Sequence, residues 1–62
     1  KTIIRINNED GTKKYVQHTF PTIETTDREE NALRMDFQTA LSVSLALGTL
    51  KIGHSMITKP NW

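Results

Sequence analysis

The strongest constraint on this chain is the stretch LSVSLALGTLKIGHSMI, from Leu41 to Ile57, in which Lys51 is the only charged residue. A transmembrane helix needs about 20 mainly apolar residues in a row, whereas this stretch is interrupted by Gly48 and Gly53. We therefore interpret it as two elements joined at Gly48, the end of a helix and the start of a strand. The sequence predicts no membrane segment.

Length and composition limit how the fold can be stabilised. The chain has 62 residues, of which 35% are hydrophobic, and it contains no cysteine. A domain of this size buries only about 60% of its unfolded surface, so we expect a single domain over residues 1–62 that depends on close packing and oligomerisation. The lack of cysteine excludes disulfide bonds and fits a cytoplasmic setting. The net charge of +1 is no reason to expect nucleic acid or a membrane surface as partner.

The N-terminal third predicts a β-hairpin. Thr2–Asn7 is rich in β-branched residues, and Lys13–Phe20 alternates with a period of two. The letters NEDGT between them predict a turn in which Gly11 can adopt a positive φ. Pro21 has no N–H for a strand ladder, so we expect it to end the hairpin.

A helix is predicted to follow. The letters TTDREE have the pattern of a capping box, with Thr26 as N-cap and Glu29 three residues later. We expect a helix from about Asp27 to Leu47, with Gly48 at the C′ position. Apolar and small residues at spacings of three and four predict the face that packs on the sheet: Leu33, Phe37, Ala40, Leu41, Ser44 and Leu47.

The last segment, Thr49–Thr58, predicts a third strand lying antiparallel beside the first. The expected fold class is α+β: a ββαβ chain with a three-stranded antiparallel sheet in order 2-1-3 and one long helix packed on one face. That helix would be about 30 Å long at 1.5 Å per residue, longer than the hairpin can cover. We expect its uncovered side to form a homodimer through Met35, Thr39, Val43 and Ala46.

The sequence contains few candidates for chemistry. His18 and His54 fall on strand faces shared with apolar residues, and no third ligand accompanies them as a zinc site requires. Ser44 or Ser55 beside a histidine would need an orienting carboxylate and an oxyanion hole to act as a nucleophile. We therefore expect structural histidines, with a pH-sensitive contact as the alternative, and no metal, cofactor or enzyme activity.

The sheet face opposite the helix is the expected binding surface. Aromatic and Arg side chains dominate protein interfaces, so we expect contact with a macromolecular partner, a protein, on this face. A sheet face with Tyr and basic groups also suits nucleic acid, which is the alternative partner. The expected partner-binding residues are Arg5, Tyr15, Gln17, Lys51 and Ile57.

The layout of an acidic hairpin around NNEDGTKKY, then a helix and a closing strand, resembles the phage inhibitors of uracil-DNA glycosylase. Those inhibitors mimic DNA by being strongly acidic, and this chain is not. The resemblance implies a small binding module of phage or mobile-element type that modulates or inhibits its partner.

Overall fold

The two N-terminal strands form where the residue alternation predicts them. β1 (Thr2–Asn7) pairs antiparallel with β2 (Lys13–His18), so the second strand ends two residues earlier than predicted. Arg5 lies opposite Tyr15 in this pairing. β2 ends before Pro21, which follows a cis peptide bond.

The turn between β1 and β2 is held by short hydrogen bonds. Gly11 has a φ of 87°, in the region that favours glycine. The Thr12 hydroxyl and backbone N–H donate to the Asp10 carboxylate at 2.6 and 2.9 Å. These bonds, the hydroxyl first, lower the pKa of Asp10 below its ordinary value of 3.8. The prediction of a positive φ at Gly11 is confirmed.

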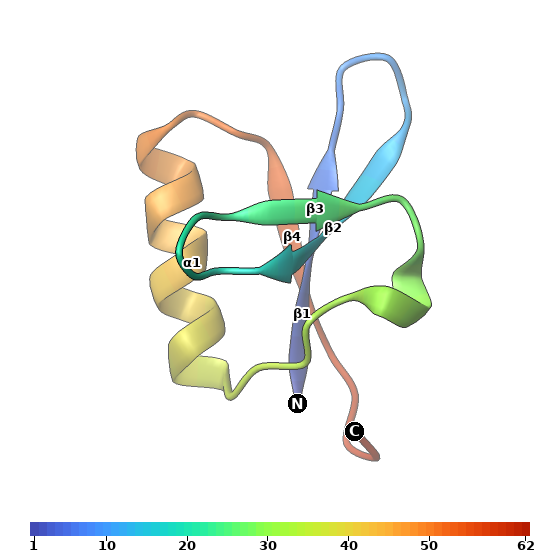
Figure 1. Cartoon of the computed structure of the whole chain (residues 1–62), viewed down its shortest axis with the longest axis vertical. Helices are drawn as coiled ribbons and strands as arrows, with labels where there is room; N and C mark the ends of the chain where they lie inside the picture. Colours follow the sequence, from blue (N-terminus) through green and yellow to red (C-terminus); the bar gives the residue numbers. More distant parts are fainter.

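The computed structural model describes all residues of the chain, 1–62. Its sheet has four strands in the order β3-β2-β1-β4 (Figure 1). β4 (His54–Thr58) lies antiparallel beside β1, as predicted for the last strand. The three-strand prediction was wrong in omitting β3 (Glu24–Thr26), which extends the sheet beyond β2. The reason is local: β-branched Thr26 fits a strand edge opposite Tyr15, and its hydroxyl accepts the Arg28 N–H at 3.2 Å instead of capping a helix.

The helix is shorter than predicted. α1 spans Phe37–Thr49 rather than residues 27–47, and it is preceded by a 3-10 helix, η1 (Glu29–Asn31), and an extended segment. Figure 1 shows η1 and α1 on opposite sides of the sheet. The predicted capping box therefore lies outside the α-helix.

Residues 32–36 are extended because they complete the hydrogen bonding of the sheet. The pairing of β1 with β2 stops at Arg5 and Tyr15, beyond which the strands separate. The Leu33 N–H donates to the Val16 carbonyl at 2.8 Å. Met35 and Thr2 exchange two backbone hydrogen bonds, both of 2.8 Å. Helix over this segment would leave buried backbone groups without partners.

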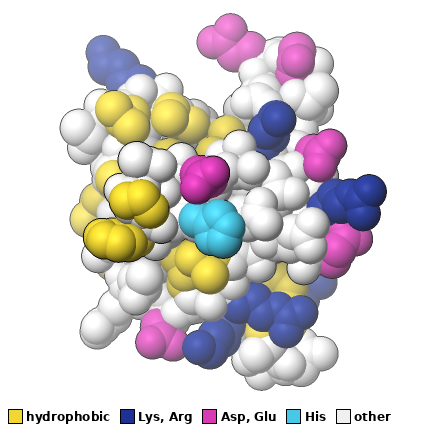
Figure 2. All heavy atoms as spheres, in the orientation of Figure 1, with side chains coloured by type: hydrophobic (Ala, Val, Ile, Leu, Met, Phe, Trp, Pro, Cys, Tyr) yellow, Lys and Arg dark blue, Asp and Glu magenta, His cyan; other side chains and the backbone are white.

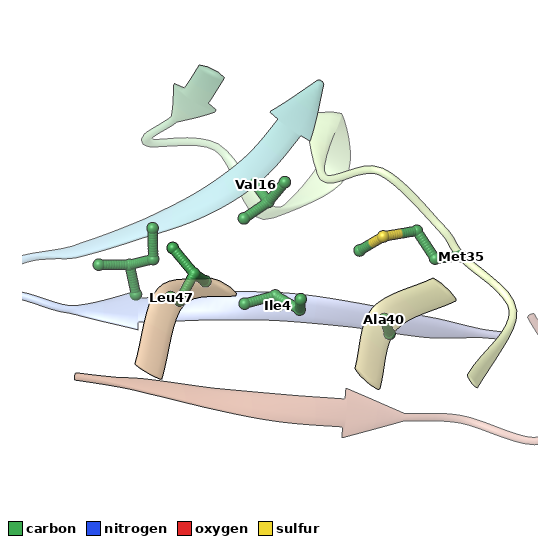
Figure 3. Packing of buried hydrophobic residues seen from close by; sticks show 6 residues of the cluster. Ile4, Val16, Met35, Ala40 and Leu47 are labelled. Atoms are coloured by element: carbon green, nitrogen blue, oxygen red, sulfur yellow. The ribbon is translucent and has the colours of Figure 1, made fainter. Parts of the chain in front are cut away.

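The core lies between α1 and the sheet (Figure 3). Ala40 and Leu47 are buried as predicted, but Phe37 is 58% exposed and Leu41 42% exposed, so their assignment to the core was wrong. The helix turns Ala40, Val43 and Leu47 toward the sheet instead, and the small Ala40 side chain permits close approach. The buried cluster comprises Ile4, Ile6, Val16, Met35, Ala40 and Leu47.

The junction of α1 and β4 also differs from the prediction. Gly48 lies inside α1, and Lys51, three residues later, has the positive φ, of 60°. The Ile52 N–H donates to the Leu47 carbonyl at 2.9 Å, which folds the chain back before β4 begins at His54. The last strand is therefore five residues long, shorter than the predicted 49–58.

The sheet face away from α1 is partly covered by the chain itself. Ile3 points to this face, yet it is only 1% exposed. η1 packs against β2 on this side, and the Trp62 ring is half-buried. None of the helices has the length and apolar character needed to span a membrane.

Candidate interaction surfaces

A row of polar side chains crosses all four strands on the face away from α1. The strand registers place Arg5 opposite Tyr15 on one side and opposite Ser55 on the other, and Tyr15 opposite Thr26. Residues directly opposite in a sheet point to the same face. All four side chains are half-buried. We call Thr26, Tyr15, Arg5 and Ser55 the polar row.

Arg5 is the only charged member of the polar row, and its hydrogen bonding is incomplete. Its Nε atom is buried and has no hydrogen-bond partner. A buried donor without a partner costs free energy, and a guanidinium cannot lose its proton to relieve that cost. The neighbouring Ser55 hydroxyl already accepts a hydrogen bond from the Asn7 side-chain amide at 3.2 Å. Arg5 is thus the one charged group of the polar row, half-buried as a residue, with its Nε atom enclosed within the fold.

The remaining expected partner-binding residues divide into two groups. Ile57 is half-buried on the same face as the polar row and lies opposite Ile3. Gln17 is also half-buried, but it lies at a register shift between Val16 and His18, so strand alternation does not assign its side chain to a face. Lys51 does not join them, because β4 begins three residues later than Lys51 and leaves it exposed in the turn after α1. The polar row adds Thr26 and Ser55, of which Ser55 could be placed from strand alternation alone.

The residues expected to form a dimer are also separated. Met35 is 4% exposed and belongs to the core, because its backbone pairs with Thr2 at the start of β1. Thr39 and Ala46 are exposed on α1, and Val43 is half-buried against the core. Of the residues expected to form the dimer, only Thr39, Val43 and Ala46 on α1 therefore lie at or near the surface.

A second apolar surface escaped the sequence reasoning. Phe37, Leu41 and Leu45 are spaced by four residues, so they form one line along α1, which we call the outer stripe. Phe20, in the β2–β3 connection, is 88% exposed. Figure 2 shows hydrophobic side chains beside this connection, on the face of the molecule where β2 and β3 lie in front of β4. The spacing of four residues in the outer stripe is visible in the sequence, but two of its members, Phe37 and Leu41, are among the residues predicted to lie in the core.

An aromatic and basic cluster lies where the two ends of the chain meet. The Trp62 ring has the Arg34 guanidinium 5.3 Å and the Lys59 ammonium 5.2 Å from its centroid, which is within cation–π range. Figure 2 shows Lys and Arg side chains gathered at this end of the molecule. No sequence pattern had singled out Trp62 or Arg34.

One serine and one histidine meet in the structure. The Ser44 hydroxyl lies 2.5 Å from Nε2 of His54, and His54 Nδ1 lies 2.8 Å from the Ile52 carbonyl. A carbonyl can only accept, so Nδ1 carries the proton and Nε2 accepts from Ser44. This pair connects α1 to β4. His18 lies on β2, separated from β4 by β1, so the two histidines do not meet.

No group of three or more His, Asp or Glu side chains is close enough to hold a metal ion, and the surface has no pocket. The candidate surfaces are therefore the polar row, the outer stripe and the cluster around Trp62. Compared with protein-family models, curated proteins and solved structures, the chain matches none of them.

Proposed function

We propose that this chain is a small protein-binding module that acts by occupying a surface of a partner protein through the polar row, and so modulates or inhibits that partner. The observation that carries the proposal is the pairing of Arg5 with Tyr15 as half-buried neighbours on the face away from α1. Arg and Tyr are among the residues that contribute most to binding at protein interfaces.

The chemistry of the polar row specifies what the partner presents. A guanidinium binds a carboxylate through two parallel hydrogen bonds, which are about twice as strong as neutral ones. The Tyr15 ring beside it offers an apolar surface, and the hydroxyls of Thr26 and Ser55 offer further donors and acceptors. The partner is thus a protein segment with an Asp or Glu side chain next to an apolar one.

Charge favours a protein over nucleic acid. Affinity for DNA or RNA comes mainly from many cations that neutralise phosphates, whereas Arg5 is the single cation of the polar row. The chain as a whole carries a net charge of +1. The lack of cysteine fits the cytoplasm, where we expect this partner to be met.

The proposal is tested by selecting ligands from a displayed peptide library and titrating the selected peptides. We expect them to contain Asp or Glu, and we expect Arg5→Ala to weaken their binding about tenfold or more, since a charged hydrogen bond contributes roughly 1.5–3 kcal/mol. Tyr15→Ala should weaken binding as well. Lys14→Ala is the matched control, because Lys14 is an exposed cation on β2 that lies opposite Ile6 and so points to the other face.

Two results would contradict the proposal. One is a set of selected peptides whose binding is the same with Arg5→Ala as with Lys14→Ala. The other is binding to DNA or RNA oligonucleotides that falls steeply with salt concentration, which would identify phosphate contacts. Circular dichroism of each variant shows whether the fold is intact.

A further inference from the structure

The two edges of the sheet differ in how well they are protected. The β3 edge is three residues long and carries Glu24, with Asp27 directly after it. The β4 edge is five residues long, with the sequence HSMIT, and contains neither Lys, Glu, Asp nor Pro. Natural proteins shorten or charge an edge strand to prevent it from pairing with another chain. β4 itself lacks these protections, although Lys59 and Pro60 directly follow it as Asp27 follows β3.

The backbone of β4 has free hydrogen-bonding groups along its outer side. The Asn7 N–H donates to the Gly53 carbonyl at 2.9 Å. Hydrogen bonds to one neighbour alternate along an antiparallel strand, so Ser55 and Ile57 also bond to β1. The N–H and C=O groups of His54, Met56 and Thr58 therefore point away from the sheet, where no further strand pairs with them.

The outer stripe lies on the β4 side of α1. Ser44 follows Leu41 by three residues and Phe37 by seven, so these side chains share one side of the helix. Ser44 reaches His54 on β4 through their hydrogen bond. The stripe therefore projects over the unprotected edge strand, with Phe37 58%, Leu41 42% and Leu45 67% exposed.

We propose that these two features form one interface, which binds a second copy of this chain. In this dimer, β4 pairs antiparallel with β4 of the partner about a two-fold axis at Met56. The two sheets become one continuous sheet, and both copies of α1 lie on the same face of it. The outer stripes then contact each other across the axis.

The spacing of the elements fits this arrangement. α1 packs on both β1 and β4, and in the proposed dimer we take its axis to lie over the line between them. Neighbouring strands lie about 4.8 Å apart, so the axis of α1 is about 4.8 Å from the two-fold axis, and the two helices are about 9.6 Å apart. Packed helices lie 8–10 Å apart, so strand pairing brings the outer stripes to contact distance.

The charge and area of the surface are also compatible with self-association. No charged side chain occurs from Phe37 to Leu50 or within β4, so two copies meet without like-charge repulsion. At about 200 Å² for a large apolar side chain, the exposed parts of the outer stripe amount to roughly 330 Å² per copy. A biological interface buries at least about 1,000 Å² in total, so in the proposed dimer the strand edges have to supply about a third of that minimum, and we expect a modest affinity.

This interface differs from the one that the sequence predicts, because Thr39 and Ala46 lie on the other side of α1. It is also independent of the partner-binding proposal. The two-fold axis is perpendicular to the sheet, so Arg5 and Tyr15 of both copies stay free on the face opposite α1. A failure of dimerisation leaves the peptide-binding experiment unaffected.

Sedimentation equilibrium over a micromolar concentration range tests the proposal. We expect the mass to rise from 7.1 kDa toward twice that value. The double variant Leu41→Glu/Leu45→Glu should stay at the monomer mass, because it places like charges on both sides of the axis. The matched control Thr39→Glu/Ala46→Glu changes two exposed residues on the other side of α1 and should still dimerise. A monomeric parent chain, or a dimer that only the control variant disrupts, would overturn the proposal.

Amide hydrogen exchange of the unaltered chain tests the strand pairing directly. The N–H groups of His54, Met56 and Thr58 should exchange more slowly as the protein concentration rises. Those of Ser55 and Ile57 should be protected at every concentration, because they bond to β1 within one copy. Exchange at Met56 that does not change while the mass doubles would show a different interface and refute pairing through β4.

Discussion

The Ser44 hydroxyl donates a 2.5 Å hydrogen bond to Nε2 of His54, which ties the middle of α1 to the first residue of β4. The other ring nitrogen, Nδ1, donates to the Ile52 carbonyl at 2.8 Å. The imidazole thus bridges helix, turn and strand with both nitrogens satisfied. This pair links α1 to β4 on the side of the helix that carries Phe37 and Leu41.

Replacing Ser44 with Ala should lower the free energy of unfolding by about 1–2 kcal/mol, because Nε2 of a half-buried His54 loses its donor. Ser42→Ala is the matched control, since the exposed Ser42 hydroxyl only donates to the Gln38 carbonyl of its own helix. Urea denaturation measures both. Equal stability of the two variants would mean that the bridge contributes nothing.

Gly48→Ala should raise the free energy of unfolding by about 1 kcal/mol, the difference in helix propensity between Gly and Ala. Gly48 lies within α1, and no atom lies within 4 Å of a Cβ added there. Gly11→Ala is the opposite case, because its φ of 87° should make the change destabilising by about 1–2 kcal/mol. The melting temperatures of the two variants should therefore shift in opposite directions. A lower melting temperature for Gly48→Ala would instead support the predicted C′ position of Gly48.

Leu47→Ala should cost about 2–5 kcal/mol, since it leaves a cavity beneath a fully buried side chain. This cost is a large part of the total free energy of unfolding, which is roughly 3–9 kcal/mol for a domain of this length. Phe37→Ala, in contrast, removes an exposed ring and should cost less than about 1 kcal/mol. Denaturation should be measured at concentrations too low for self-association. If Phe37→Ala lowered the free energy of unfolding more than Leu47→Ala, this result would contradict the orientation of α1, because Phe37 would then belong to the core.

Asp10 should contribute stability that disappears in acid. Because its pKa in the folded chain is lower than the ordinary 3.8, the carboxylate stabilises the fold above that pH, and the contribution is lost as the pH falls through the lower, folded value. Asp10→Asn cannot titrate, so its free energy of unfolding should lack this part of the pH dependence. Denaturation curves collected at a series of acidic pH values measure the difference. Parallel pH profiles would contradict the role of the Thr12 hydrogen bonds.

Met56→Cys should form a disulfide-linked dimer under mild oxidation. Hydrogen-bonded antiparallel pairs have Cα atoms about 5.5 Å apart, which a disulfide can span. The chain has no other cysteine to compete. Ser42→Cys, on the exposed side of α1, is the control and should stay monomeric. Mass spectrometry without reductant distinguishes the two, and equal cross-linking of both would indicate random collision.

Part of the candidate surface could be predicted from residue alternation. Arg5 and Tyr15 are expected on one sheet face because side chains alternate along a strand, and the structure brings them directly opposite each other. The same alternation does not hold for Gln17, because the register shifts between Val16 and His18. Lys51 could not be placed correctly, because its position depends on where α1 gives way to β4. That point is set by the Ile52 N–H bond to Leu47, which local sequence does not reveal.

The outer stripe was hidden by an ambiguity in the helix pattern. Phe37, Ala40, Leu41 and Leu47 all fit apolar spacings of three and four, so spacing alone does not say which of them face the sheet. Contact with β1 and β4 decides this, and it favours the small Ala40 side chain at the closest approach. The larger side chains of Phe37 and Leu41 therefore lie on the flank of α1, where they are partly exposed.

By itself, the sequence determined the β1–β2 hairpin, the glycine turn and the antiparallel pairing of the last strand with the first. The hairpin and its turn follow from local backbone preferences and from the side-chain period of two, which act over a few residues. The pairing of the last strand with the first follows from the way short connections restrict the topology. Only the tertiary structure decided that residues 32–36 are extended. The groups that hold them there, Thr2 and the Val16 carbonyl, come from strands far away in the sequence. A capping-box pattern is worth about 1 kcal/mol, and the unpaired backbone groups that a helix would leave at the strand ends cost more than that.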